Sequence, residues 1–233
     1  MTSEQTEQPA SSALKILVID VGGTHVKMVA TGHETKVKFA SGSTLTPGEM
    51  VKQVKALTEG WGYEAVSIGY PGVVLHLRIA AEPHNLGPGW LGFDFKAAFG
   101  CDVRVVNDAA MQALGSYNGG RMLFLGLGTG LGSAMIVEGQ LEPMELAHLP
   151  YRKGRTYEEE VGATGLERLG KKKWRTRVAD VIATLSAALV VDDVVIGGGN
   201  AALLKELPPN TRLGSNSNAF TGGFRLWDTV VAK

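Results

Sequence analysis

The sequence predicts an α/β fold, because apolar runs typical of buried strands alternate with segments whose apolar residues recur at helical spacing. Glycine turns end several of the predicted strands. Both halves of the chain open in the same order, with a strand, a glycine turn and a second strand, at residues 14–30 and 122–137. We therefore expect two α/β lobes, at residues 14–106 and 107–233. Residues 1–13 are polar and are expected to form a disordered tail.

The first lobe is predicted to start with a β-hairpin, because two apolar runs flank the pair Gly22-Gly23. Its predicted strands lie at residues 14–19, 26–30, 35–40, 65–70 and 103–106. Helices are predicted at residues 47–59, with Pro47 near the start, and at 109–117. Residues 82–92 are dense in Pro, Gly and Asn and predict a loop.

The second lobe is predicted to contain strands at residues 122–125, 134–137 and 194–196. Thr156 and Glu159 have the spacing of a capping box, which starts a helix expected to end near Gly170. A second helix follows, because an apolar stripe runs from Trp174 to Leu189. Another helix is expected after the glycine run at residues 197–199.

Composition excludes several classes of protein. The 233 residues include 23 basic and 23 acidic side chains, so bulk charge gives no case for a nucleic-acid partner. The single cysteine, Cys101, excludes a disulfide framework and a zinc site made of several thiolates. No apolar run reaches the roughly 18 residues that a membrane span needs. The start of the chain lacks the pattern of a signal peptide, so we expect a cytoplasmic protein with no membrane partner.

Two glycine turns are suited to binding phosphate. In Asp20-Val-Gly-Gly-Thr24 no side chains cover the backbone N–H groups, and Asp20 is placed to hold the water shell of a metal ion. The second turn, at residues 126–132, precedes a strand rather than the helix of a dinucleotide fingerprint. Its N–H groups and the Thr129 hydroxyl are also suited to phosphate. Either turn alone is compatible with an ordinary hairpin, but the pair favours a phosphate chain held from two sides.

The chain resembles the ROK family (repressor, open reading frame, kinase) of sugar kinases and sugar repressors. The matching motifs are Asp20-Val-Gly-Gly-Thr24, Gly69-Tyr-Pro71-Gly72, Asn107-Asp108-Ala109, the turn at 126–132, Glu145-Leu-Ala-His148 and Gly197-Gly198-Gly199. The resemblance implies an actin-like, ribonuclease-H-like fold with two lobes around a cleft. It also implies phosphoryl transfer to a hexose hydroxyl with Mg²⁺. The short chain and its lack of thiolates are most similar to the glucokinase branch that uses polyphosphate, and no zinc is expected.

By this resemblance Asp108 is the catalytic base that accepts the proton of the sugar hydroxyl, and Asn107 is a hydrogen-bond partner of the sugar. Both residues lie where a strand ends and a helix begins, so one of them is also suited to capping that helix. A helix N-terminus favours the ionised carboxylate. Asp108 is therefore expected to be only weakly basic.

Further sugar ligands are implied by the same resemblance. Glu145 and His148 match the outer residues of the family's Glu-x-Gly-His, although Ala147 stands for the glycine and is expected to narrow the pocket or to shift His148. Asn85 matches a sugar-binding Asn, while the nearby Trp90 is interpreted as a packing anchor. Each of these residues also has a purely structural interpretation.

A last sugar-binding Glu is expected four residues ahead of Thr164-Gly165, which is the position of Glu160. Helical geometry agrees with this choice. Glu159 is used by the capping box, Glu158 is expected to face away, and Glu160 lies on the packed face. The alternative is a solvated helix acid.

The donor site implied by these motifs comprises Asp20, Gly22, Gly23, Thr24, Lys27, Gly128, Thr129, Gly130, Gly198 and Gly199, with Mg²⁺ held by Asp20 through water. For Lys27 the alternative, which is equally compatible with the sequence, is an exposed lysine on the strand that contacts no phosphate. The basic run of Lys171, Lys172 and Lys173 with Arg175 and Arg177 is either a solvated helix face or a track for polyphosphate.

The expected function is transfer of a phosphoryl group from polyphosphate or ATP to the 6-hydroxyl of glucose. One alternative is an ATP-dependent kinase for another hexose or an N-acetylhexosamine. A second alternative is a non-catalytic sugar sensor, which in this family carries a DNA-binding module before the first strand, where this chain has about a dozen polar residues. Relatives often form homodimers, so a homodimer is compatible with the resemblance.

Overall fold

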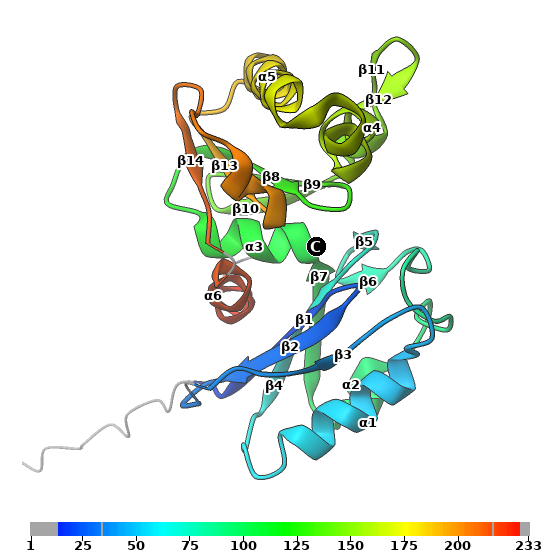
Figure 1. Ribbon diagram of the computed structural model, residues 1–233. Helices are drawn as coiled ribbons and strands as arrows, with labels where there is room; N and C mark the ends of the chain where they lie inside the picture. The colour runs from blue at the N-terminus through cyan, green and yellow to red at the C-terminus, as the bar shows by residue number, and fades with distance from the viewer. Residues whose placement is uncertain (1–13, 34, 216, 229–233) are drawn as a thin grey trace, which may run out of the picture.

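Two five-stranded sheets are joined by a central helix in the computed structural model, which describes residues 14–33, 35–215 and 217–228 (Figure 1). The first sheet has the order β3-β2-β1-β4-β7. Its strands are β1 (Ile16–Val21), β2 (His25–Ala30), β3 (Val37–Ala40), β4 (Ala65–Tyr70) and β7 (Asp102–Asn107). The second sheet has the order β10-β9-β8-β13-β14. Its strands are β8 (Arg121–Leu127), β9 (Leu131–Val137), β10 (Gln140–Met144), β13 (Asp193–Gly197) and β14 (Thr211–Leu213).

The two sheets share one topology. In each, the first two strands form an antiparallel hairpin, β1–β2 in the first sheet and β8–β9 in the second. In each, the first strand then pairs in parallel with a strand that follows a crossover, β4 or β13. The predicted similarity between the openings of the two halves is therefore confirmed by strand order and direction.

The helices cover the faces of the sheets. They are α1 (Pro47–Leu57), α2 (Phe95–Phe99), α3 (Asp108–Ser116), α4 (Tyr157–Val161), α5 (Ala163–Leu189) and α6 (Asn218–Arg225), with the 3₁₀ turns η1 (Leu146–His148) and η2 (Gly199–Leu203). Two short hairpins complete the fold, β5 (Val74–Leu75) with β6 (Arg78–Ile79) and β11 (Pro150–Arg152) with β12 (Arg155–Thr156). No helix in the described part of the chain has the length and apolar character needed to cross a bilayer.

Each lobe has its own hydrophobic core, and a third core lies between the sheets around α3. Met50 of α1 and Trp90 pack in the first lobe, and Trp174 and Val178 of α5 pack in the second. Met111 of α3 belongs to the central core. Helix α3 can approach both sheets closely because they present glycines: a Cβ at Gly69 would press against the side chain of Met111, and one at Gly132 would lie 2.9 Å from Ala109 Cβ.

Helix α6 returns to the first lobe from the end of the described chain. Ser67 Oγ on β4 donates to Gly223 O at 2.6 Å and accepts from Trp227 Nε1 at 2.8 Å. Arg104 on β7 donates to Leu226 O at 2.6 Å. Helix α6, which follows the second sheet in the sequence, therefore packs on the sheet of the first lobe.

The helix predictions in the second lobe are confirmed in part. The helix expected to start at Thr156 and to end near Gly170 is divided at Gly162, which is extended (φ −73°, ψ −173°). Its expected end is present, because Gly170 is non-helical (φ 71°, ψ 156°) and a second helical segment follows up to Leu189. A Cβ at Gly162 would lie 2.9 Å from Thr129 O, so a glycine is needed where the chain touches the second glycine turn. The helix expected after Gly199 is the 3₁₀ turn η2.

Candidate active site

Asp108 is the first residue of α3, at the junction of the two sheets. The cap of this helix is its neighbour Asn107, whose Oδ1 accepts from the N–H groups of Ala109 at 2.8 Å and Ala110 at 3.3 Å. Asn107 Nδ2 donates to Gly72 O at 3.0 Å. Because Asn107 caps the helix, the carboxylate of Asp108 remains available, with one hydrogen bond from its neighbour Ala109 N at 2.8 Å.

The surroundings of Asp108 raise its pKa to about 7. The main cause is the loss of water around the carboxyl, and the negative charges of Asp20 and Glu145 act in the same direction. The backbone N–H of Ala109 lowers the pKa by a smaller amount. The expectation of a weakly basic Asp108 is therefore wrong, because burial and like charges outweigh the helix N-terminus. A carboxylate of this kind can accept a proton near neutral pH.

The first glycine turn connects β1 to β2 and leaves Gly23 and Thr24 exposed. Gly22 N donates to His25 O at 3.0 Å, and Ser41 Oγ donates to Gly22 O at 2.5 Å. The N–H of Gly22 is thus used inside the hairpin and is not available to a ligand. Gly22 is needed for the tight turn, since a Cβ there would lie 3.1 Å from His25 O. The exposed groups of the turn are those of Gly23 and Thr24.

Asp20 lies at the end of β1 with a side chain that is 15% exposed. Burial raises its pKa, and Lys27, whose Nζ lies 3.5 Å from Asp20 Oδ2, lowers it. Asp20 also lies close enough to Asp108 for its negative charge to raise the pKa of Asp108. The fold thus brings together two carboxylates that are far apart in the sequence. Among the described residues no group of three or more His, Cys, Asp or Glu side chains is suited to a metal ion.

The second glycine turn is held in place by α5 and η2. Gly128 N donates to Gly130 O at 3.1 Å within the turn. From outside, Ala163 N at the start of α5 donates to Thr129 O at 3.0 Å, and Asn200 Nδ2 of η2 donates to Gly128 O at 3.1 Å. Thr129 itself is exposed, so its hydroxyl is accessible to a ligand.

In the third glycine run, at residues 197–199, the structure requires a glycine at position 198. Its φ of 83° is left-handed, and a Cβ there would collide with the backbone of Leu127 beside the second glycine turn. Gly199 has open space around a Cβ position. The close approach of β13 to the turn therefore depends on Gly198.

Glu145 and His148 lie at the two ends of η1, which contacts β9. Glu145 Oε2 and His148 Nε2 are 3.9 Å apart, and the side chains are 45% and 70% exposed. Ala147 between them is buried in the core of the second lobe. The methyl group packs into the core, which contradicts a narrowed pocket, while a shift of His148 stays a prediction.

The carboxylate of Glu160 is buried among arginine side chains. Glu160 is on the packed face as predicted, but its carboxylate binds Arg168 at 2.7 Å and Arg177 at 3.1 Å, with Arg155 at 3.9 Å. Three guanidinium groups thus surround Glu160.

Glu158 does not face away, and that expectation is wrong. Its Oε2 accepts from Leu131 N at 3.0 Å beside Gly130, and its charge raises the pKa of Glu145. Glu158 is thus a residue beside the second glycine turn that sequence reasoning did not place there, and its position in the first turn of α4 was the available signal.

The loop at residues 82–92 brings Asn85 to the first glycine turn. A Cβ at Gly23 would lie 3.4 Å from Asn85 Cβ. The loop is anchored by Glu82, whose carboxylate accepts from the N–H groups of Gly89, Trp90 and Leu91 at 3.0–3.2 Å. Trp90 is fully buried and its Nε1 donates to Leu45 O at 3.4 Å, which confirms it as a packing anchor.

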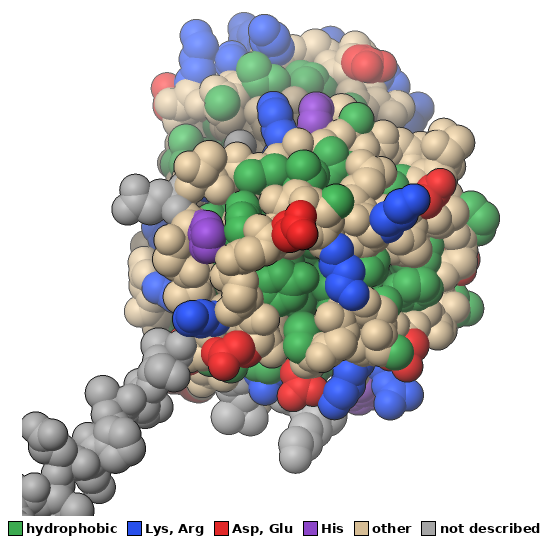
Figure 2. All heavy atoms as spheres, turned by 90° about the horizontal axis from the view of Figure 1, so that it is seen from below, with side chains coloured by type: hydrophobic (Ala, Val, Ile, Leu, Met, Phe, Trp, Pro, Cys, Tyr) green, Lys and Arg blue, Asp and Glu red, His purple; other side chains and the backbone are tan. Residues whose placement is uncertain are grey.

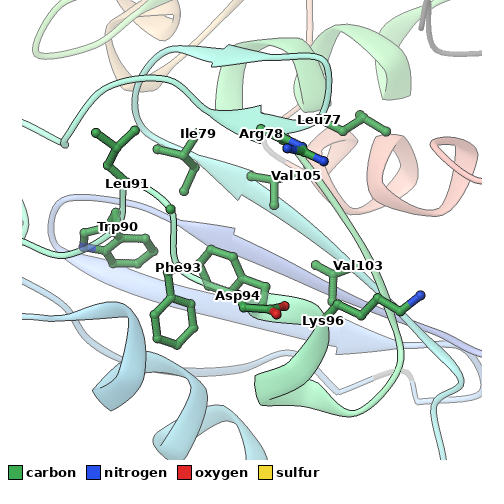
Figure 3. A pocket seen from close by; sticks show the side chains of 12 residues that line it. Leu77, Arg78, Ile79, Trp90, Leu91, Phe93, Asp94, Lys96, Val103 and Val105 are labelled. Carbon is green, nitrogen blue, oxygen red and sulfur yellow. The ribbon is translucent and has the colours of Figure 1, made fainter.

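A separate pocket of about 640 Å³ opens on the first lobe (Figure 3). It is lined by apolar side chains, among them Ile79, Trp90, Phe93 and Val105, and by the charged side chains of Arg78, Asp94 and Lys96. None of the predicted sugar or phosphate residues lines it. The candidate site is therefore defined by the carboxylates and glycine turns around Asp108 and not by this pocket.

Residues 16–143, more than half of the chain, match the model of the ROK family. The chain belongs to the ROK family. The matched residues include the first glycine turn with Asp20, the loop with Asn85, Asp108 and the second glycine turn. The resemblance predicted from these motifs is therefore confirmed.

Curated relatives and solved structures agree with this assignment. The chain is 30% identical over 205 residues to the polyphosphate glucokinase of Mycobacterium tuberculosis, covering 78% of this chain and 76% of that protein. The crystal structure of an inorganic polyphosphate/ATP-glucomannokinase from an Arthrobacter species is similar with a TM-score of 0.75 and 24% identity, over 91% of this chain and 97% of that one. A ROK glucokinase from Streptomyces griseus, solved with glucose and AMPPNP, gives a TM-score of 0.71 and 17% identity, over 91% and 98% of the chains. The predicted two-lobed, actin-like fold of ROK sugar kinases is thus confirmed.

Proposed function

We propose that this ROK protein is a glucokinase that transfers the terminal phosphoryl group of polyphosphate or ATP to the 6-hydroxyl of glucose. The observation that carries the proposal is Asp108, a carboxylate with a pKa raised to about 7, placed between two sheets that each present a bare glycine turn. Similarity to polyphosphate glucokinases supports the same activity.

Asp108 acts on the acceptor hydroxyl. It orients the 6-hydroxyl toward the donor and accepts its proton as the new O–P bond forms. The bond between the transferred phosphorus and the bridging oxygen breaks, and its electron pair leaves with the shortened donor. Because the transition state of such transfers is loose, orientation and charge stabilisation are the main contributions of the protein.

Sugar contacts come from both lobes in this proposal. Asn85 in the first lobe and Glu145 and His148 in the second offer amide, carboxylate and imidazole groups to the other hydroxyls. Asn107 retains one amide hydrogen besides the one that it donates to Gly72. We assign to Glu158 the role that the sequence suggested for Glu160, because Glu158 lies beside Glu145 and Glu160 is enclosed by arginines.

The donor phosphates are assigned to the two glycine turns. Gly23, Thr24, Thr129 and Gly130 are accessible there, and Lys27 adds a positive charge next to Asp20. The residues present fit Mg²⁺, since Asp20 lies close enough to Asp108 for its charge to raise the pKa of Asp108, and two neighbouring carboxylates favour a cation. Asp20 would hold this ion through water, and when bound it would neutralise charge on the donor phosphates. A full protein cage is not available among the described residues, which agrees with Mg²⁺ keeping water and phosphate ligands.

Formation of glucose 6-phosphate by the purified protein tests this proposal, with polyphosphate and ATP supplied separately and Mg²⁺ present. We expect product with at least one donor. We also expect Asp108→Asn to lose about 100- to 10,000-fold in kcat while glucose binding, measured by calorimetry, stays close to wild type. A protein that binds glucose but transfers no phosphoryl group from either donor would be a sugar sensor, and the proposal would be wrong. Mannose and N-acetylglucosamine, assayed in parallel, define the acceptor.

A further inference from the structure

Positive charge is concentrated on one part of a chain that is neutral overall. Residues 168–177 contain six Lys or Arg residues and no Asp or Glu. They belong to α5, on either side of its kink at Gly170. On the face of the molecule seen in Figure 2, by contrast, basic and acidic side chains are interspersed among apolar ones. The basic segment of α5 is therefore a distinct feature of the second lobe.

The three arginines of this segment have structural partners. Arg168 and Arg177 bind Glu160, and Arg175 Nε donates to Leu203 O of η2 at 2.5 Å. The lysines at 171, 172 and 173 are exposed. Within the part of the chain that the structure describes, no carboxylate lies within ion-pair distance of them. Their charge is thus available to an anionic ligand.

Helical phase divides the lysines between two sides of α5. Lys171 is one turn before Arg175 and so lies on the same side, which is the side of η2. Lys172 lies within about 60° of Arg175 around the helix axis, whereas Lys173 is about 160° away. Lys171, Lys172 and Arg175 therefore share the side next to η2, and Lys173 points elsewhere.

The same side of α5 is connected to the second glycine turn. Asn200 at one end of η2 binds the carbonyl of Gly128 in that turn, and Leu203 at the other end binds Arg175. The first residue of α5, Ala163, also binds the turn. A linear anion that starts at Thr129 and follows η2 would thus reach the basic side of α5.

We infer that Lys171, Lys172 and Arg175 form a second binding site for a long polyphosphate donor, which holds phosphates remote from the one transferred. The inference rests on the proposed phosphoryl transfer. It extends that function because ATP carries no charge beyond its third phosphate, whereas polyphosphate presents a charge at every unit. Several weak contacts to one flexible polyanion act together, so this site raises the affinity for long chains and leaves ATP unaffected.

The test compares two variants with the same change in net charge. Lys171→Glu/Lys172→Glu reverses the charge next to η2. Lys52→Glu/Lys173→Glu reverses one exposed lysine on α1 and the lysine on the other side of α5. The KM of each is measured for long-chain polyphosphate, tripolyphosphate and ATP, at low and high salt. We expect the first variant to raise the KM for long-chain polyphosphate at least about tenfold at low salt and less at high salt. The KM for ATP should stay within about twofold in both variants.

Equal responses of the two variants to long-chain polyphosphate would overturn the inference and leave the kinase function intact. An equal rise in the KM for ATP would also overturn it, because the lysines would then act on the phosphates common to all donors. If the wild-type protein phosphorylates glucose with ATP and not with polyphosphate, the second site is refuted while the glucokinase function stands. Failure with both donors refutes the function itself.

Discussion

At the scale of single residues, Asp108 experiences opposing influences on its charge. The start of α3 favours the carboxylate, while the loss of water and the charges of Asp20 and Glu145 favour the acid form. The second set of influences wins and raises the pKa to about 7. Sequence alone placed Asp108 at a helix start but gave no information on the two carboxylates that the fold brings close to it.

This pKa predicts the pH dependence of catalysis. Since the ionised form of Asp108 accepts the proton, kcat/KM should rise with pH along an acid limb whose midpoint is near 7 and level off above it. Asp20→Asn removes the largest like charge and should move the midpoint to lower pH while lowering the plateau. Initial rates at subsaturating glucose between pH 5 and 9 provide the measurement. An acid limb that Asp20→Asn leaves at the same pH would contradict the coupling of the two carboxylates.

Glu158 and Glu160 of α4 should respond oppositely to loss of charge. Glu158→Gln keeps an acceptor for Leu131 N, so stability should change by less than about 1 kcal/mol, whereas kcat/KM for glucose should fall about 10- to 100-fold. Glu160→Gln removes the carboxylate that faces three arginines, of which only Arg177 keeps another carboxylate partner, Asp180 at 3.8 Å, among the described residues. This substitution should cost about 3 kcal/mol in the free energy of unfolding, with kcat/KM close to wild type. Urea unfolding and steady-state kinetics of both variants test this pair. The reverse pattern would return the sugar-binding role to Glu160.

At the scale of elements, the contact between α3 and α6 depends on glycines. A Cβ at Gly222 would collide with the backbone carbonyl of Met111, and one at Gly115 would collide with that of Asn218. The same glycines weaken the helical signal of α6, since Gly is a poor helix former. The sequence accordingly gave no indication of this helix, whose position is decided by close packing on α3.

Gly222→Ala should therefore destabilise the protein, although alanine is the better helix former. A backbone carbonyl cannot move aside as a side chain can, so we expect a loss of at least about 2 kcal/mol in the free energy of unfolding. Thr221→Ala is the matched control on the exposed side of α6 and should change stability by less than about 0.5 kcal/mol. Chemical denaturation measures both. Equal stabilities of the two variants would show that α6 can shift away from α3.

At the scale of the whole molecule, the features that the sequence predicted are those with local causes. The spacing of apolar residues and the turn residues predict four features that are all present in the structure. They are the hairpin around Gly22-Gly23, the hairpin around the turn at 126–132, helix α1 and the helix with the apolar stripe from Trp174 to Leu189. The features missed have non-local causes. The break at Gly162 exists because α4 and α5 meet Thr129, and α6 returns to β4 from more than 150 residues away in the sequence. The motifs placed Asp108 at the start of α3 and Glu145 beside η1, whereas the contact of Glu158 with the second glycine turn had no signal in the motifs.

The charge of Asp108 also links the site to the stability of the molecule. Its folded-state pKa lies above the ordinary value of 3.8, so between pH 3.8 and about 7 the folded protein retains a proton that the unfolded chain has released. The free energy of unfolding should fall as pH rises through this window, and the full cost of ionising Asp108 in the folded protein should be present above pH 7.

Asp108→Asn removes this cost of ionisation, so the variant should be more stable than wild type by about 1–3 kcal/mol at pH 8 and by progressively less toward pH 4. Urea unfolding at pH 4, 6 and 8 measures the difference, with Asp94→Asn on the exposed first-lobe surface as a control for loss of one acid. A stability gain of Asp108→Asn that is constant across these pH values would show that the carboxylate is ionised throughout, and would remove the basis for Asp108 as a base of near-neutral pKa.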